Sequence, residues 1–329
     1  MKKVIAILAL VLSSTFALAQ DTPLEISGSA DAYWKYDFAK TANIPTSFAT
    51  DQNSLSLGMI DVVLKKKTGK TSFVGEVSFG PRGTGQSIPD VDGQSFHIQN
   101  LYATYAASDK LSLTAGYMGT FIGYEVISPL GNFHYSTSYL FTTGPFQNAG
   151  IKANYAVSSK VGLMVGLFND QWNAYKAVPE FGLNAFGAQL SVTPAEGLTA
   201  YLNLLTGSES GTIVDLTAAY QVSPKFKLGL NAADFSGPVS GTGYSGVALY
   251  PSVAISDSFG LGLRAESFKS KTTDTSVSAF TLSANLKSGG LTFIPEFRLD
   301  SASEEDFYTS NGNPTKSASQ FALAMVYGF

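Results

Sequence analysis

Few side chains in this 329-residue sequence could carry out chemistry. It contains no cysteine and two histidines, His97 and His134. Ser136 follows His134 by two residues, but no pattern of a hydrolase nucleophile turn surrounds that serine. The Gly-rich stretch 80–85 lacks the strand–loop–helix context of a phosphate-binding loop. Two histidines with scattered acids do not give the spacing of a metal site. We therefore expect no enzyme, no cofactor and no metal.

The charged residues are sparse and most often stand in segments whose hydrophobicity alternates. They make up 14% of the sequence, against about 25% in an average soluble domain. The formal net charge of −4 and the lack of a long basic stretch argue against a nucleic-acid partner. Six charged positions lie on the polar faces of such segments and are predicted lumen charges: Glu76, Lys152, Arg264, Glu266, Glu296 and Arg298.

The alternation has a period of two residues. In 161–167, Val161, Leu163, Val165 and Leu167 alternate with small or flexible side chains, and successive side chains of a strand point to opposite faces. The segments are about ten to thirteen residues long, where globular strands have about 5–6 and tilted membrane strands need about 9–11. Aromatic residues gather at their ends, as an interfacial girdle requires. The sequence thus predicts an all-β, transmembrane, antiparallel up-and-down barrel.

The connections between these segments alternate between short and long. Seven short turns rich in Ser, Asp, Pro and Gly and eight longer polar loops give sixteen strands. Because the loops at 207–211 and 270–274 are short for outer loops, fourteen or eighteen strands also fit. In 53–66 and 95–107 either face could contact lipid. The predicted strands are 24–39, 53–66, 71–81, 95–107, 110–120, 145–157, 160–171, 180–193, 197–207, 211–223, 225–236, 242–256, 258–269, 275–287, 290–301 and 317–329.

The two ends of the sequence carry targeting features. Lys2 and Lys3, an apolar run and the small-residue site 17–19 indicate a cleaved signal peptide over 1–19, with the barrel over 20–329. The apolar run is shorter than the roughly 20 residues that a spanning helix needs. The segment 317–329 is an amphipathic strand with Tyr327 and Phe329 on its apolar face. That end resembles the signal read by outer-membrane assembly machinery, which predicts export to the cell outer membrane.

The stretch 114–173 resembles the OmpL-like β-barrel porin family of Gram-negative bacteria. In that family a strand ending in a Gly motif is followed by a Gly-Tyr-Glu motif, an Asn- and Ser-rich stretch, a Pro-Phe strand start and an Asn/Trp strand end. The corresponding residues here are 114–117, 122–125, 132–139, 144–146 and 168–173. Tyr117 replaces a common Lys, Thr137 stands where Arg is common, and Gln147 also departs from the pattern. The resemblance implies a porin for passive diffusion of small hydrophilic solutes.

The connection 121–144 is the longest and follows the fifth predicted strand. By similarity to general porins we expect it to fold inward, with Tyr124, Glu125 and His134 forming a pore constriction. A sixteen-strand barrel has a lumen too wide for wall side chains alone to fill, and opposed charges across a pore select solutes by charge. In the alternative interpretation, Glu125 hydrogen-bonds the loop to the wall and the lumen charges pair with each other.

Expected partners are outer-membrane lipid, the barrel assembly machinery and small hydrophilic solutes. A homotrimer is also considered, with the small outer residues Gly28, Ala30 and Ala32 of the first strand as a candidate contact. An alternative function is a non-conducting structural or adhesive barrel with its interior filled by loops. Conductance in a lipid bilayer distinguishes the two functions.

Overall fold

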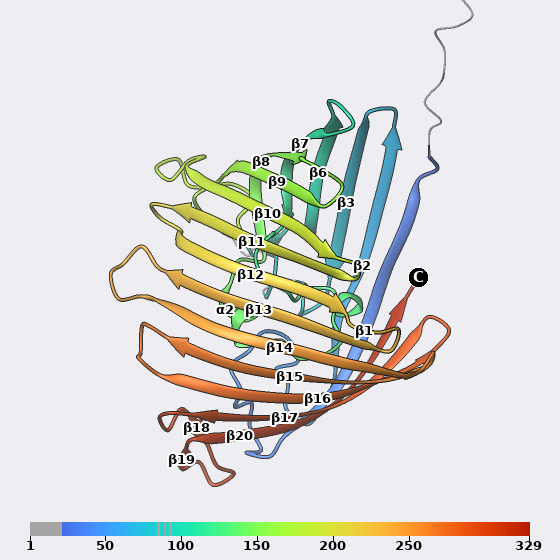
Figure 1. The fold of residues 1–329 in the computed structure, drawn as a ribbon. Coiled ribbons are helices and arrows are strands. Elements are labelled where there is room, and N and C mark those ends of the chain that lie inside the picture. The colour runs from blue at the N-terminus through green and yellow to red at the C-terminus, as the bar shows by residue number, and fades with distance from the viewer. Residues whose placement is uncertain (1–21, 84–85, 89, 92–93) are drawn as a thin grey trace, which may run out of the picture.

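The alternating segments form a closed antiparallel barrel of sixteen strands in the computed structural model (Figure 1). The structure describes residues 22–83, 86–88, 90–91 and 94–329, so the predicted signal peptide 1–19 lies outside the described residues. Each strand pairs with its neighbours along the chain, and β20 pairs with β1 to close the barrel. The predicted all-β class and the sixteen strands are confirmed, which excludes the alternatives of fourteen and eighteen.

The strands lie within a few residues of their predicted positions. The barrel strands are β1 (Glu25–Asp37), β2 (Ser54–Thr68), β3 (Thr71–Phe79), β6 (Ile98–Ala106), β7 (Leu111–Gly119), β8 (Gln147–Ala156), β9 (Val161–Phe168), β10 (Ala185–Ala195), β11 (Leu198–Gly207), β12 (Gly211–Gln221), β13 (Phe226–Ser236), β14 (Gly243–Ser256), β15 (Phe259–Ser270), β16 (Ser276–Ser288), β17 (Leu291–Ala302) and β20 (Ser317–Gly328). Two small hairpins, β4 (Asp90–Val91) with β5 (Gln94–Ser95) and β18 (Phe307–Tyr308) with β19 (Pro314–Thr315), lie in the long connections.

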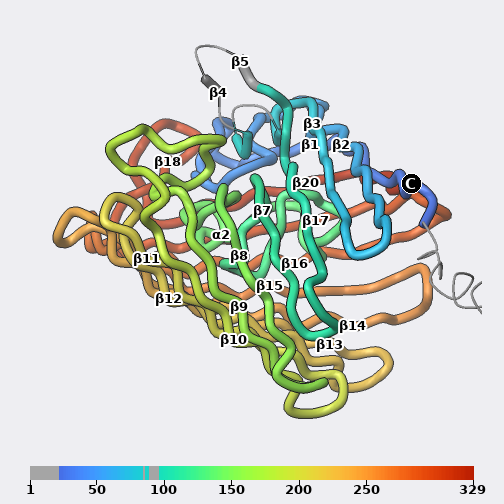
Figure 2. Tube along the Cα trace, turned by 90° about the horizontal axis from the view of Figure 1, so that it is seen from above, coloured from blue at the N-terminus to red at the C-terminus, as the bar shows by residue number. Residues whose placement is uncertain are grey.

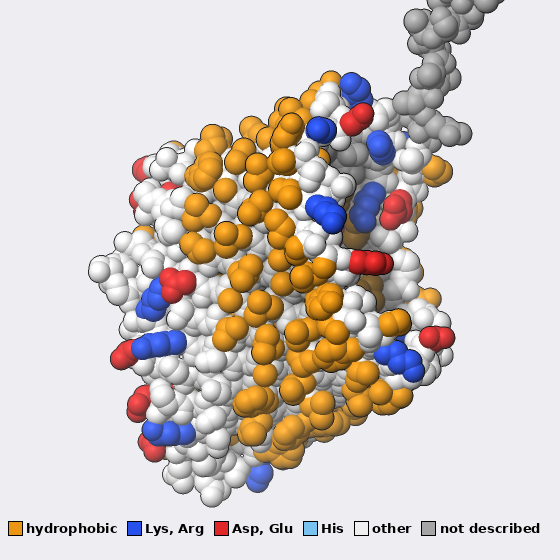
Figure 3. All heavy atoms as spheres, viewed as in Figure 1, with side chains coloured by type: hydrophobic (Ala, Val, Ile, Leu, Met, Phe, Trp, Pro, Cys, Tyr) orange, Lys and Arg blue, Asp and Glu red, His pale blue; other side chains and the backbone are white. Residues whose placement is uncertain are grey.

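The face of the barrel drawn in Figure 3 carries an apolar band. Hydrophobic side chains cover the middle of the barrel, and charged side chains gather at the two rims on either side of it (Figure 3). In β9, Leu163, Val165 and Leu167 are 45%, 51% and 50% exposed, whereas the intervening Met164 is 4% exposed. An apolar belt of this kind matches the hydrocarbon core of a bilayer, while the inner face stays polar or packed.

Two β-bulges explain why the alternation was ambiguous in two strands. Between β1 and β2, Ala30 pairs with Ile60 and Ala32 pairs with Leu57, so β2 contains one extra residue. Between β3 and β6, Glu76 pairs with Asn100 and Val77 with Ile98, which gives β6 an extra residue as well. A bulge shifts every later side chain to the opposite face. The apolar pattern therefore changes parity within each strand.

The connections differ in length at the two ends of the barrel. Short turns join the strands at one end, and the longer connections lie at the other end with β18 and β19 (Figure 1). The strand ends meet at the short-turn end, where Gly28 and Phe329 exchange backbone hydrogen bonds of 3.0 and 3.1 Å. In the described part of the chain, no helix is long and apolar enough to cross a membrane. The one α-helix of this part, α2 (Tyr139–Thr143), lies within the outline of the barrel in both views (Figures 1 and 2).

Candidate functional site

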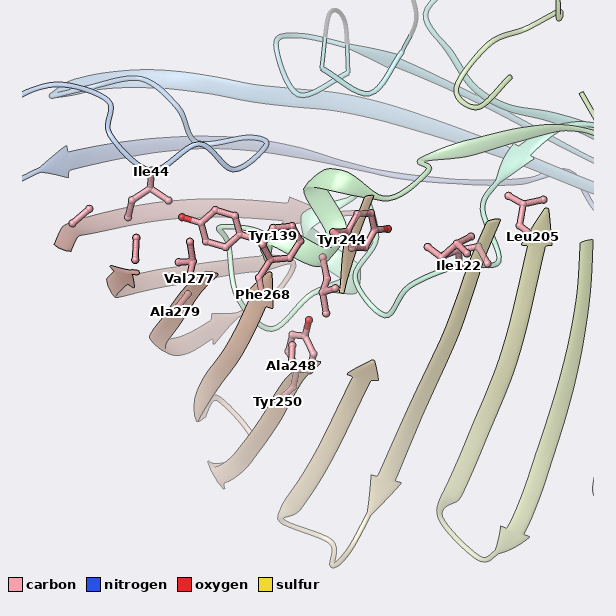
Figure 4. Close-up of a cluster of buried hydrophobic side chains, with 14 of the residues drawn as sticks. Ile44, Ile122, Tyr139, Leu205, Tyr244, Ala248, Tyr250, Phe268, Val277 and Ala279 are labelled. Carbon is pink, nitrogen blue, oxygen red and sulfur yellow. The ribbon is translucent and has the colours of Figure 1, made fainter. Parts of the chain in front are cut away.

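Residues 120–146, which we call the inserted segment, connect β7 to β8 and lie against the inner wall. They contain a single 3-10 turn, Pro129–Gly131, and the helix α2. Tyr139 of α2 stacks on Phe268 of β15, with ring centroids 5.5 Å apart, and Phe268 in turn stacks on Tyr244 of β14. Figure 4 shows these side chains meeting inside the barrel. The segment therefore packs on strands that are far from it in the sequence.

The Glu125 carboxylate and the Arg264 guanidinium join the inserted segment to β15. Oε1 of Glu125 lies 2.7 Å from Nη1 of Arg264, and both side chains are buried. Arg264 also donates to the backbone oxygen of Ser136 at 2.6 Å and to Thr281 Oγ1 at 3.0 Å. Glu125 accepts from the Ser138 backbone N–H at 2.8 Å. Both members of this buried pair make further hydrogen bonds, which offset part of the cost of removing their charges from water.

Two further wall carboxylates bind backbone amides of the inserted segment. Glu266 accepts from the N–H groups of Tyr139 and Leu140 at 3.0 and 2.8 Å. These amides belong to the first turn of α2, where a helix has free N–H groups and favours negative charge. Glu296 of β17 accepts in the same way from Tyr135 and Ser136 at 2.9 and 3.1 Å. The wall thus supplies acceptors at two places along the segment.

Arg298 of β17 joins the wall, the inserted segment and the first long connection, residues 38–53 between β1 and β2. It makes a bidentate pair with Asp300, at 2.8 and 2.9 Å. Its Nη1 donates to the backbone oxygen of Thr137 at 2.8 Å and to Thr46 Oγ1 at 3.1 Å. The Tyr139 hydroxyl donates to Asp300 at 2.8 Å. Sequence reasoning named Arg298 but missed Asp300, which continues the same inward face of β17.

The other two predicted constriction residues lie at the same wall. Nδ1 of His134 is 2.7 Å from Ser283 Oγ, which donates to Glu296 at 2.7 Å. Tyr124 stacks on Tyr250 of β14, with centroids 4.5 Å apart. His134 is buried and Tyr124 is half-buried. The structure therefore brings Tyr124, Glu125 and His134 together with Arg264, Glu266, Glu296 and Arg298.

Glycines on the inner wall make room for the large side chains of the inserted segment. A Cβ atom at Gly262 would lie 2.4 Å from the Phe133 ring, and one at Gly229 would lie 2.3 Å from the Tyr124 hydroxyl. Real Cβ atoms do not approach other atoms so closely. Gly229 and Gly262 stand on the polar faces of their alternating segments. Their inward glycines were the available signal that another part of the chain packs there.

The first long connection, 38–53, also contacts the inserted segment. Phe48 packs on Phe141 and Phe146, with centroids 5.8 and 6.1 Å apart. The Thr137 hydroxyl donates to the backbone oxygen of Ser47 at 2.7 Å. Arg82, from the connection after β3, lies over the Phe48 ring at 4.4 Å. The sequence did not predict these contacts, since pairing between separate connections leaves no local pattern.

Glu76 and Lys152 do not join this network. Glu76 of β3 accepts a hydrogen bond of 2.6 Å from the Asn100 side chain. Lys152 of β8 pairs in register with Thr114 and Gly166. Both are half-buried, whereas Arg264, Glu266, Glu296 and Arg298 are at most 3% exposed. The inner face around Glu76 and Lys152 is therefore accessible to water, while that around Arg264, Glu266, Glu296 and Arg298 is covered.

Near the long connections, part of the inner face is apolar. Ile122 of the inserted segment belongs to a buried cluster with Phe168, Leu205 and Ile213. The labelled Ile122 and Leu205 lie at one side of this cluster in Figure 4. Trp172 and Phe235 pack against it. These contacts fill part of the lumen beside β9–β13.

The two predicted assembly residues lie at the short-turn end. Tyr327 and Phe329 are 49% and 53% exposed on the outer face. No group of three or more His, Cys, Asp or Glu that could hold a metal ion occurs among the described residues.

Comparison with known proteins places this geometry in a family. Residues 23–329 match the family described as "Putative beta-barrel porin-2, OmpL-like". The chain belongs to this family. The match covers the whole barrel of this OmpL-like chain, so the family indicated by 114–173 is confirmed. No curated protein matches the sequence.

Solved structures share the fold at low identity. An anion-selective porin from Comamonas acidovorans is 13% identical to the OmpL-like chain, with a TM-score of 0.64 over 94% of this chain and 100% of that one. The trimer form of OmpT, an outer membrane protein of Vibrio cholerae, is 11% identical, with a TM-score of 0.60 over 94% and 99%. A mutant porin of Rh. blastica is 15% identical, with a TM-score of 0.53 over 93% and 100%. Family and fold together identify an outer-membrane β-barrel.

Proposed function

We propose that this protein is an outer-membrane porin through which small hydrophilic solutes diffuse passively. The observation that carries the proposal is the unequal covering of the inner wall. Buried charges hold the inserted segment on β15–β17, and the side chains of Glu76, Asn100 and Lys152 stay half-buried. A sixteen-strand barrel is wide enough for an aqueous channel. Solutes would pass between the inserted segment and the side of Glu76, Asn100 and Lys152.

The constriction in this proposal is formed by the inserted segment. Tyr124, Glu125 and His134 fix its position through their wall contacts. Glu125 is neutralised by Arg264, so the charges facing a passing solute beside the inserted segment are Glu76 and Lys152. Passive diffusion requires no nucleophile, metal or cofactor, and we propose that the protein is not an enzyme.

A non-conducting structural or adhesive barrel is the second candidate. The buried apolar cluster of Ile122, Phe168, Leu205 and Ile213 favours it, because packed apolar side chains exclude water from that part of the lumen. The two candidates differ in whether a continuous water path remains beside the cluster.

Export and assembly complete the proposal. Residues 1–19 would be removed as a signal peptide, and Tyr327 and Phe329 would be recognised by the assembly machinery. A homotrimer would bury the small outer side chains Ala30 and Ala32 of β1. Mass measurement of the detergent-purified protein by light scattering distinguishes a monomer from a trimer.

Single-channel recording in a planar lipid bilayer tests the proposed function. The expected result is stepwise conductance of uniform size, together with swelling of liposomes in small sugars and amino acids but not in larger oligosaccharides. Substituting Lys152→Glu should shift the permeability ratio toward cations, since this residue would face the water path. A correctly folded barrel without conductance steps would overturn the porin in favour of the non-conducting barrel.

A further inference from the structure

Two adjoining cavities lie beneath the inserted segment, toward the short-turn end of the barrel. Their volumes are about 550 and 630 Å³. Five residues line both of them: Phe133, Lys227, Ser252, Asn285 and Lys287. Each cavity is large enough for a small organic solute, and cavities of 300–1,000 Å³ are typical of ligand sites.

Strand register places the two lysines on the inner face. Lys227 of β13 lies two residues before Gly229, whose missing Cβ makes room for Tyr124 of the inserted segment. Lys287 of β16 lies two residues after Asn285, which donates to the backbone oxygen of Phe133 at 3.0 Å. Since side chains of a strand alternate in direction, Lys227 and Lys287 share the inner face with Gly229 and Asn285.

The charges of this region are unbalanced. Neither Lys227 nor Lys287 has a carboxylate within ion-pair distance among the described residues. Lys225 adds a third ammonium group to the wall of the second cavity. The acids lining the cavities are Glu125, which is paired with Arg264, and Asp257 in a turn. A recess with several unpaired ammonium groups attracts anions.

The spacing of the lysines favours a solute with two acidic groups. β13 and β16 are three strand spacings apart, about 14 Å between backbones, and both lysines line the same cavities. A solute in the shared part of the cavities would therefore lie between both ammonium groups. Ser252 and Thr292 provide hydroxyl groups, and the Phe133 ring provides an apolar surface for a short carbon chain.

We propose that these cavities form a binding site for small organic dianions, with Lys227 and Lys287 binding the two acidic groups. In a conducting barrel the site would concentrate dicarboxylates at the short-turn mouth. That role depends on the proposed porin function, whereas the binding itself does not.

Equilibrium binding of succinate to the detergent-solubilised full barrel at low ionic strength tests the site. Succinamide, which has the same shape without charge, serves as the comparison probe. The double variant Lys227→Gln/Lys287→Gln should weaken succinate binding at least tenfold, because each ammonium at about 4 Å contributes a few-fold even in water. Inorganic phosphate is titrated as well, to separate general anion attraction from recognition of two acidic groups.

A matched control removes the same charge from the same rim. Lys70→Gln/Lys160→Gln changes two lysines at other short turns, away from both cavities, and should leave succinate binding unchanged. Equal weakening in both double variants, equal binding of succinamide, or phosphate binding as tight as succinate would overturn the proposal. Conductance of the same samples is recorded separately, so loss of the porin function and loss of the anion site give different results.

Discussion

The carboxylate of Glu125 and the guanidinium of Arg264 form an ion pair of 2.7 Å whose side chains are 4% and 0% exposed. The two residues are 139 positions apart in the sequence. Because the pair is covered, its charges cancel inside the wall instead of facing a solute. The geometry therefore favours the alternative interpretation, in which Glu125 attaches the inserted segment to the wall.

Substituting Glu125→Ala should destabilise the barrel by leaving Arg264 buried without its counter-ion. Removing one partner of a buried pair costs about 3–5 kcal/mol. The double variant Glu125→Gln/Arg264→Met should lose less than the sum of its single variants, since no unpaired charge remains. Urea unfolding of the lipid-reconstituted protein measures these differences.

The exposed loop residue Glu180 provides the control for this cycle. Glu180→Ala also removes one negative charge, but from an exposed side chain, and should change stability by less than about 0.5 kcal/mol. If Glu125→Ala unfolds at the same urea concentration as the wild type, the ion pair does not hold the inserted segment.

The strands could be predicted from the sequence because the lipid imposes one rule along the whole barrel. Every outward side chain of β9, for example, must be apolar, and the short turns mark its ends. In β2 and β6 the pattern did not decide which face contacts lipid, because a single extra residue moves all later side chains to the opposite face. A period-two pattern contains no separate signal for such a bulge.

The site was predictable only in part. Charges such as Arg264 and Glu296 stood out because charged residues are rare on membrane strands. Their partners did not, since the backbone amides of Tyr135 and Ser136 carry no sequence signature. Local periodicity also says nothing about which wall strands a connection contacts. Inward glycines such as Gly262 were the one clue to that packing.

Substituting Gly262→Val should displace the inserted segment. A Cβ at this position would lie 2.4 Å from the Phe133 ring, and overpacking typically costs about 1–3 kcal/mol. We expect lower stability and, if the barrel conducts, larger and noisier current steps. Gly75→Val is the control, because a Cβ there meets only Phe73, at 3.9 Å. Identical current traces and stability for the two variants would contradict this packing role.

Acid should release the contact between two outer connections at Asp170. Burial alone would raise the pKa of this carboxyl, but hydrogen bonds from Ser210, Glu209 and Ser208 outweigh burial and lower it. The Ser210 and Glu209 backbone amides donate to it at 2.8 and 3.0 Å. The pKa of Asp170 is therefore lower in the folded protein than in the unfolded chain, where it is about 3.9. The ionised carboxyl contributes its full stabilisation of the folded contact above that unfolded value, and this stabilisation is lost as the pH falls through the folded pKa.

Hydrogen exchange of the Glu209 and Ser210 amides measures this release. Their protection should be constant from pH 7 to about pH 5 and should fall at lower pH, once intrinsic exchange rates are corrected. Asp170→Asn should show weak protection at every pH, because the neutral amide is a poorer acceptor. Unchanged protection in Asp170→Asn would show that the carboxylate does not hold this contact.

The orientation of β9 in the membrane can be tested with one charge placed on either face of the wall. Val165 of β9 is 51% exposed and belongs to the apolar band. Its register partner on β8 is Ala153, and the next residue of β8, Asn154, points to the inner face. Val165→Arg should cost about 2–4 kcal/mol, because the guanidinium would lie in hydrocarbon near the middle of the strand. Asn154→Arg places the same group at nearly the same depth on the water-accessible face, and should cost far less. Urea unfolding in lipid vesicles compares them. Equal losses in the two variants would mean that the apolar band of β9 does not face the bilayer.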